Sequence, residues 1–181
     1  ISSCSDAAGN LWLGLLGRGV LRRKDGQTEH FSTRDGLVGD VVLGICSETT
    51  GTMWFATASG VSRYDGEQFT NFTSEHGLSP HEVSAIHCDA SDRVWTGNLG
   101  GEIARYDGGD SPRLYPPVES LRGHGITDIL SDTRSRLWFA TNRGGLIGYD
   151  GIAWTSLDMQ DGLPTNAITR VAEDRQGSLW L

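Results

Sequence analysis

Hydrophobic and polar residues along this chain form short runs, and no stretch shows the period of an amphipathic helix. The pattern is plainest in 42–72, with two apolar runs, "VLGICS" and "MWFAT", then "VSRY" and the alternating "QFTNF". The turn sequences "ETTG", "ASG" and "DG" separate these runs. Runs of this length bounded by turn residues predict four short antiparallel strands, the last of them half-exposed.

The pattern recurs through the whole chain. An acidic residue stands six positions before each aligned tryptophan, and Asp-Gly follows 11 to 13 positions after the first four. The aligned residues, with separations of 42, 41, 43 and 42, are Trp12, Trp54, Trp95, Trp138 and Trp180. The sequence therefore predicts an all-β fold, a β-propeller of four-stranded antiparallel blades. The expected repeats are 1–41, 42–83, 84–126 and 127–168, with a partial fifth over 169–181.

The repeated tryptophans and acids are interpreted as scaffold. A large aromatic residue on the second strand of every blade packs against the neighbouring blade, in preference to a role as a platform for sugars. The acids stand one per blade without a second acid at calcium-ligand spacing, so they are expected to cap their turns. In the third unit, "SPRLYPP" places prolines where the outer strand should run, which predicts a shortened strand.

Composition excludes several classes of partner. The formal net charge is −8, so no basic surface is available for nucleic acid or for an anionic membrane. No apolar run approaches the length of a membrane span. Three cysteines leave at least one thiol unpaired within the chain. Cys4 and Cys46 share a repeat position and could approach across neighbouring blades, Cys88 is offset by one, and a buried free thiol is the default.

The histidines show no metal-binding spacing. No H-x-x-x-H motif occurs, and no histidine pairs with cysteine at zinc spacing. His76 replaces the aspartate of a repeated "DGL" segment, and His87 is expected in the core or lining a central channel. We therefore expect no metal, no cofactor and no catalytic residues. The five histidines are His30, His76, His81, His87 and His124.

The best-formed repeats carry a resemblance to a known family. They are "GTMWFATASGVSRYDGEQFTNFTSEHGLSPHEV" (51–83) and "SRLWFATNRGGLIGYDG" followed by "DGLPTNAITRVAEDRQGSLW". This sequence closely resembles the two-component regulator propeller repeat. The resemblance implies the periplasmic or otherwise extracytoplasmic sensory part of a large signalling protein with a histidine kinase or another output domain. No kinase element is present in this sequence, so kinase activity is not assigned to it.

Topology predicts where a ligand would bind. In an up-and-down blade, the uniform acid-x-x-Gly turns and Asp-Gly hairpins share one face, and the variable loops share the other. Asparagine and arginine side chains there can hydrogen-bond the hydroxyls and carboxylates of carbohydrates. The candidates are Arg18, Ser59, Asn98, Asn142 and Arg143 from the loops after the second strands, with His81 and Asn166 from the connections between blades.

Three function hypotheses follow. The leading one is a non-catalytic module that senses a small molecule or glycan at the loop-rich face and biases a separate output domain. The second is a metal-dependent propeller enzyme resembling streptogramin lyase, which a His/Glu pair with a metal on that face would favour. The third is an assembly scaffold. Because four units are the lower limit for a propeller, we expect either an excerpt of a longer polypeptide or a ring completed by another copy.

Overall fold

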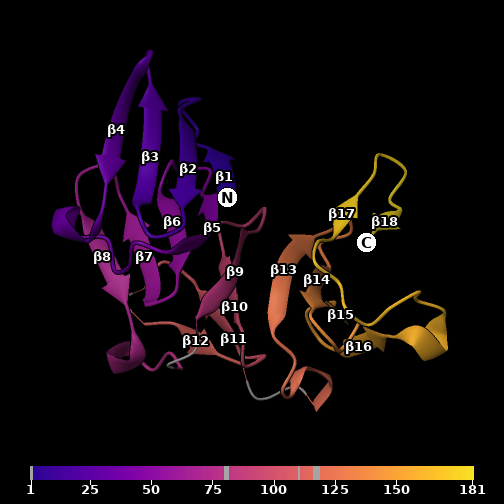
Figure 1. Ribbon diagram of the computed structural model, residues 1–181. Helices are drawn as coiled ribbons and strands as arrows, with labels where there is room; N and C mark the ends of the chain where they lie inside the picture. Colours follow the sequence, from indigo (N-terminus) through magenta and orange to yellow (C-terminus); the bar gives the residue numbers. More distant parts are fainter. Residues whose placement is uncertain (1, 80–81, 110, 116–118) are drawn as a thin grey trace.

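The computed structural model describes residues 2–79, 82–109, 111–115 and 119–181. Four four-stranded antiparallel sheets follow one another along the chain, and a two-stranded sheet comes after them. Each sheet is a meander in which strands adjacent in sequence are paired (Figure 1). This confirms the predicted β-propeller architecture of blades with a partial fifth.

Blade 1 consists of β1 (Ser2–Ser5), β2 (Leu11–Leu15), β3 (Gly19–Lys24) and β4 (Gln27–Phe31). Blade 2 consists of β5 (Val42–Ser47), β6 (Met53–Thr57), β7 (Gly60–Tyr64) and β8 (Phe69–Phe72). Blade 3 consists of β9 (Val83–Cys88), β10 (Val94–Asn98), β11 (Ile103–Tyr106) and β12 (Arg113–Leu114). Blade 4 consists of β13 (Ile126–Ser131), β14 (Leu137–Thr141), β15 (Leu146–Tyr149) and β16 (Trp154–Leu157), and the last sheet of β17 (Ala172–Glu173) and β18 (Leu179–Trp180).

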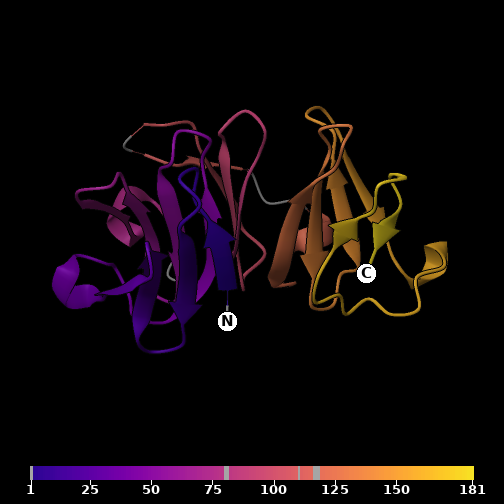
Figure 2. The same cartoon turned by 90° about the horizontal axis from the view of Figure 1, so that it is seen from above.

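The blades follow one another along an arc (Figures 1 and 2). The first strands of consecutive blades, β1, β5, β9 and β13, are neighbours on the inner side. At the end of each of the four blades a three-residue 3₁₀ turn begins the connection to the next unit. These turns are η1 (Thr33–Asp35), η2 (Ser74–His76), η3 (Glu119–Leu121) and η4 (Met159–Asp161).

The core lies between adjacent blades. Trp54 on β6 is fully buried, stacks on Phe72 with ring centroids 5.7 Å apart, and meets Tyr106 of blade 3 at 4.9 Å. Trp12 and Trp95 are equally buried, at 1% exposure. The packing role predicted for the repeated tryptophans is confirmed in blades 1–4, where Trp138 packs with Ile168 and Val171 of the next unit; in the last sheet Trp180 is exposed.

The four repeated aspartates cap their turns, as predicted, whereas Glu48 of blade 2 accepts the Thr50 hydroxyl and no backbone N–H in the described residues. In Asp132, one carboxylate oxygen accepts the backbone N–H groups of Arg134 and Arg136 at 2.9 Å. The other accepts the indole N–H of Trp138 at 3.0 Å, a bond that the sequence analysis did not foresee. All five aligned pairs make this bond, with distances of 2.7–3.0 Å. Burial raises the pKa of Asp132, but these hydrogen bonds outweigh it and hold the pKa below its ordinary value.

The connections contain a motif that was not predicted. The Ser32 side chain caps η1, the Asp35 carboxylate accepts the Ser32 backbone N–H at 2.8 Å, and Gly36 ends the turn at a φ of 105°. In η2, His76 replaces the aspartate, and its Nδ1 accepts the backbone N–H of Thr73 at 3.2 Å. The substitution of histidine for aspartate therefore preserves the capping box.

The Asp-Gly hairpins depart from expectation in three blades; in blade 3, Gly108 has positive φ but Asp107 does not. Both turn residues have positive φ in blade 1, where Asp25 has 49° and Gly26 has 81°. In blade 2 only Gly66 has positive φ, and the Asp65 carboxylate accepts the N–H groups of residues 67 and 68 at 2.9 Å. Blade 4 repeats this arrangement around Asp150. These two hairpins are longer turns capped by aspartate instead of two-residue turns.

One cysteine prediction is confirmed, since one thiol is unpaired, but the approach of Cys4 to Cys46 and the default of free thiols were wrong. Cys46 on β5 and Cys88 on β9 form a disulfide between blades 2 and 3, with their Cα atoms 5.7 Å apart, and Cys4 is free. Cys4 and Cys46 stand opposite the tryptophans of their own blades and point in the same direction, so they do not meet. Cys88 is one residue further along its strand, opposite Val94, and the strand alternation turns it back toward Cys46.

The third unit has the shortened outer strand that its prolines predicted. β12 contains only two residues, whereas the outer strands of the other three blades contain four or five. Within the described parts of the chain, none of the helices has the length and apolar character that a membrane crossing requires.

Candidate functional site

The variable loops and the connections lie on one face, as the topology predicted. Each loop after a second strand is bonded through its backbone to a neighbouring connection. In blade 2, the Ala58 N–H donates to the Val41 carbonyl at 3.1 Å, and in blade 3 the Leu99 N–H donates to the Glu82 carbonyl at 3.2 Å. We call this the loop-rich face; the acid-x-x-Gly turns lie at the opposite ends of the strands.

The predicted ligand-binding residues are spread over this face. Arg18, Ser59, Asn142 and Arg143 are exposed in three different loops. Among the described residues, none of these four side chains makes a hydrogen bond, and all four residues are exposed to solvent. His81 lies outside the described residues. These positions remain predictions of a binding role.

Asn98 and Asn166 instead bond within the scaffold. The buried Asn98 side chain accepts the N–H groups of Gly100 and Glu102 at 2.9 Å and donates to the Glu102 carboxylate at 2.6 Å. The Asn166 side chain accepts the Met159 N–H at 2.8 Å, which ties the connection onto η4. Their side chains therefore hold loop conformations.

A hollow of about 490 Å³ lies at the inner ends of the blades on the loop-rich face. We call it the central hollow. Glu82 and Arg170 give it one charge of each sign, and Ser84 and Thr127 add hydroxyls that donate at 2.6 Å to carbonyls of the following unit. The remaining lining is apolar or small: Leu16, Val42, Leu43, Leu99, Ile126 and Thr169.

A second cavity of about 510 Å³ crosses blade 3 and faces the connection from blade 2. We call it the interblade pocket. Its walls come from residues 77–79 of that connection, from β10 and β11 with the loop between them, and from Leu114, Tyr115 and Arg122. Of the predicted binding residues, Asn98 lines it.

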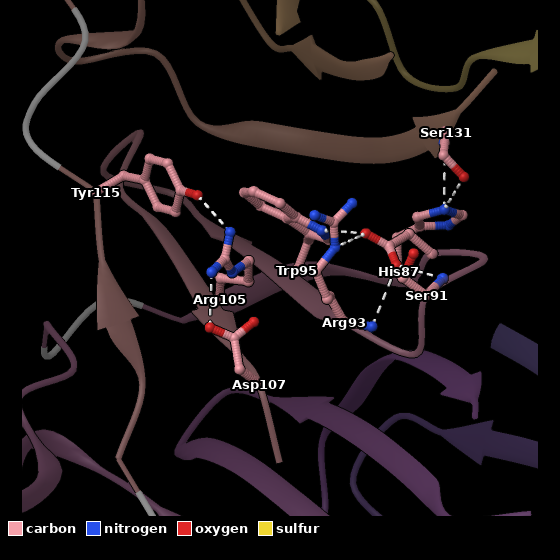
Figure 3. Close-up of polar contacts among 9 residues, drawn as sticks. His87, Ser91, Arg93, Trp95, Arg105, Asp107, Tyr115 and Ser131 are labelled. Carbon is pink, nitrogen blue, oxygen red and sulfur yellow. Dashed lines mark hydrogen bonds and ion pairs between the residues drawn. The ribbon is translucent and has the colours of Figure 1, made fainter. Parts of the chain in front are cut away.

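Tyr115, at one margin of the interblade pocket, is held by residues of blade 3 on the face that points toward blade 4 (Figure 3). Arg105 donates to the Tyr115 hydroxyl at 3.0 Å and to Asp107 at 2.7 Å, and its guanidinium lies 5.4 Å from the Trp95 ring centroid. The Trp95 indole in turn donates to Asp89 at 2.9 Å. This network gives Tyr115 a fixed orientation.

His87 belongs to the seam between blades 3 and 4. Its Nε2 lies 2.8 Å from the Ser131 hydroxyl and accepts the Ser131 backbone N–H at 3.2 Å (Figure 3). Burial lowers the pKa of His87, which favours the neutral ring that can accept this N–H. Within residues 2–79, 82–109, 111–115 and 119–181, no group of three or more His, Cys, Asp or Glu side chains could hold a metal ion.

Sequence comparison with known proteins identifies relatives of the repeats. The model of the two-component regulator propeller family matches residues 162–181. Histidine kinase P4 of Formosa agariphila is 27% identical over 148 residues, which cover 74% of this chain and 11% of that protein. Residues 162–181 therefore match the two-component regulator propeller repeat. The resemblance read from the repeat sequence is thereby confirmed, and the chain spans only about a ninth of this relative.

Solved structures agree on the fold. The extracellular domain of a protein described as a hybrid two-component system of B. thetaiotaomicron gives a TM-score of 0.83 at 22% identity, covering 98% of this chain and 25% of that one. Virginiamycin B lyase from Staphylococcus aureus also gives 0.83, at 15% identity, covering 99% of this chain and 61% of the lyase. At these identities the likeness of the propeller repeats to both proteins shows a shared fold alone.

Proposed function

We propose that this chain is a non-catalytic, ligand-sensing β-propeller module of a two-component-type signalling protein, acting outside the cytoplasm. The observation that carries the proposal is the contrast between the two faces of the blades. The acid–tryptophan turns are alike in all five units, whereas the loops of the loop-rich face differ and surround a hollow.

The disulfide supports the location. Disulfides persist in oxidising compartments and are rare in the cytosol of ordinary mesophiles. Cys46–Cys88 joins neighbouring inner strands of two blades, where it stabilises their contact. A structurally similar protein points the same way, since its solved structure is that of an extracellular domain.

The central hollow suits a polar ligand. It is open to solvent, it carries both a carboxylate and a guanidinium, and hydroxyls stand at its edge. A sugar or another small polyhydroxylated molecule presents donors and acceptors of matching kinds. Binding there would contact several blades at once and could bias their arrangement relative to an output domain.

Calorimetric titration with neutral and uronic-acid-containing oligosaccharides tests this proposal. Arg170→Ala removes the guanidinium from the hollow and should weaken binding at least about tenfold. Arg175→Ala is the matched control, because this exposed arginine lies in a turn at the opposite face and should change affinity less than about twofold. Absence of binding by every oligosaccharide, or equal affinity of both variants, would contradict the proposal. Turnover of an oligosaccharide or cyclic depsipeptide that required a divalent metal would instead support the enzyme alternative.

A further inference from the structure

The interblade pocket exists because blade 3 departs from the other blades along one row of residues. In blade 2 that row crosses the sheet as Phe55, Ser62 and Asn71, and in blade 4 as Phe139, Ile147 and Ser156. Strand register places Thr96, Ala104 and Leu114 at the same positions in blade 3. All three line the interblade pocket.

The first substitution removes an aromatic ring. Phe55 and Phe139 are both fully buried and project toward the preceding blade, where Phe55 meets Trp12 at 5.6 Å and Phe139 meets Trp95 at 6.4 Å between centroids. Thr96 is buried to 2% exposure yet has only a short side chain. The space of a phenyl ring is therefore unfilled on this side of blade 3.

A second aromatic residue is missing beside the first. Tyr64 of blade 2 stacks against Phe69 at 4.8 Å, and Tyr149 of blade 4 against Trp154 at 4.3 Å. In blade 3 the residue before Arg113 is Pro112, so Tyr106 has no such neighbour. Its hydroxyl is buried without a hydrogen-bond partner in the described residues, unlike those of Tyr64 and Tyr149, which bond to glycine carbonyls at 2.8 Å.

The remaining two positions of the row, Ala104 and Leu114, have side chains that cannot hydrogen-bond the connection. In blade 2, Ser62 accepts the Val38 N–H at 2.9 Å, and Asn71 donates to the Gly36 carbonyl at 2.9 Å. These bonds hold the incoming connection against the sheet. Ala104 and Leu114 offer no such bond, and the corresponding connection residues, 77–79, form the opposite wall of the pocket. The pocket therefore lies between residues 77–79 of the connection and the short side chains of Thr96 and Ala104 on the sheet.

We propose that the interblade pocket is a second binding site, for a small molecule that inserts an aromatic ring between the blade 2 connection and blade 3. The cavity of about 510 Å³ is within the range of small-molecule sites, about 300–1,000 Å³. Its walls are mainly apolar, through Leu78, Val83 and Leu114, which an aromatic ring can contact. The Tyr115 ring packs on the other side of the sheet against Trp95 and Tyr149, and it closes the pocket from there. Glu102 and Arg122 provide polar contacts for substituents of the ring. This site is separate from the central hollow and does not depend on the sensing proposal.

The test uses 6-fluoroindole as the probe and follows its ¹⁹F resonance during titration with the full chain. The wild-type protein should broaden and shift the resonance in a saturable manner. Thr96→Phe restores the residue of blades 2 and 4, fills the space and should weaken binding at least about tenfold. Leu13→Phe makes a comparable addition at the same repeat position of blade 1 and should keep affinity within about twofold, as should Arg170→Ala in the central hollow.

Folding of each variant is checked by its thermal transition and circular dichroism. If Thr96→Phe does not fold, Leu114→Trp carries the same test, because Leu114 is 53% exposed at the margin of the pocket and a larger side chain there narrows it without entering the core. Failure of the wild-type protein to bind 6-fluoroindole overturns the proposal. Binding to the folded filled variant within about twofold of wild type also overturns it. Neither result bears on oligosaccharide binding in the central hollow.

Discussion

Blades 2 and 3 share one repeat sequence but differ in how completely they are packed. Blade 2 presents Phe55 and Phe69 to its predecessor, and its connection is held by Ser62 and Asn71. Blade 3 keeps Trp95 and its acid, Asp89, but lacks those aromatic and hydrogen-bonding groups. The comparison separates the part of the repeat that forms a blade from the part that seals one blade against the next.

This separation follows from what each group contacts. The acid–tryptophan bond is made within a blade, between residues six positions apart, so it forms independently of the neighbouring sheet. The phenyl rings fill space between blades, and their loss leaves the strands intact. A blade can therefore lose its seal and keep its fold, which allows a pocket to arise by a few substitutions.

Phe55→Thr should give the largest effect, because it imposes the blade 3 residue on blade 2. Loss of a fully buried phenyl ring is expected to lower the free energy of unfolding by about 3–5 kcal/mol, measured by urea denaturation. Leu13→Thr, at the same repeat position but half-buried in blade 1, should cost less than half as much. Equal losses in the two variants would show that Phe55 does not seal the blades.

The sequence predicts those features of the fold that depend on residues close together in the chain, and it predicts contacts between distant residues less well. The period near 42 and the turn residues predict the blades, because both are local. The contrast of "VWTGN" with "MWFAT" and "LWFAT" already marks Thr96 as exceptional, although its meaning needs the strand register. Repeat position alone does not predict the Cys46–Cys88 pair, because the direction of each side chain depends on strand alternation.

The disulfide offers a second way to test the comparison, since it joins the two contrasted blades. Cys46→Ser combined with Cys88→Ser should lower the free energy of unfolding by about 2–4 kcal/mol in the absence of reductant, because the loop it closes spans 42 residues. Reductant should lower the stability of the wild-type protein and leave the double variant unchanged. Cys4→Ser is the control, because Cys4 is free and partly exposed.

If the double variant matched the wild-type protein in urea denaturation, blades 2 and 3 would be held together by packing alone. The seal formed by Val83, Val94 and the Trp54 cluster would then be sufficient, and the gap at Thr96 would have little consequence for stability. The expected result is the opposite, because the disulfide lies at a junction where the phenyl ring is missing.

The smallest expected effect concerns the acid that blade 3 retains. Asp89 is 7% exposed, and its burial raises the pKa of the carboxyl. Hydrogen bonds from Trp95, Ser91 and Arg93 lower the pKa by more than burial raises it, so the pKa lies below the ordinary value of 3.8. A carboxyl with a depressed pKa in the folded state stabilises the protein above its unfolded pKa, and this contribution is lost as pH falls below about 4. Asp89→Asn should therefore cost about 2 kcal/mol at pH 7, where hydrogen bonds to a charged group are lost.

The pH dependence distinguishes this cap from simple packing. The difference in unfolding free energy between wild type and Asp89→Asn should shrink as the pH is lowered from 7 through 4 toward 3, since the wild-type carboxylate becomes protonated. Asp25→Asn, in an exposed hairpin where asparagine accepts the same positive φ, should show little difference at any pH. If the difference in unfolding free energy between wild type and Asp89→Asn stayed constant across this range, the charge of Asp89 would contribute nothing to stability. The side chain would then act only through its packing and its neutral hydrogen bonds.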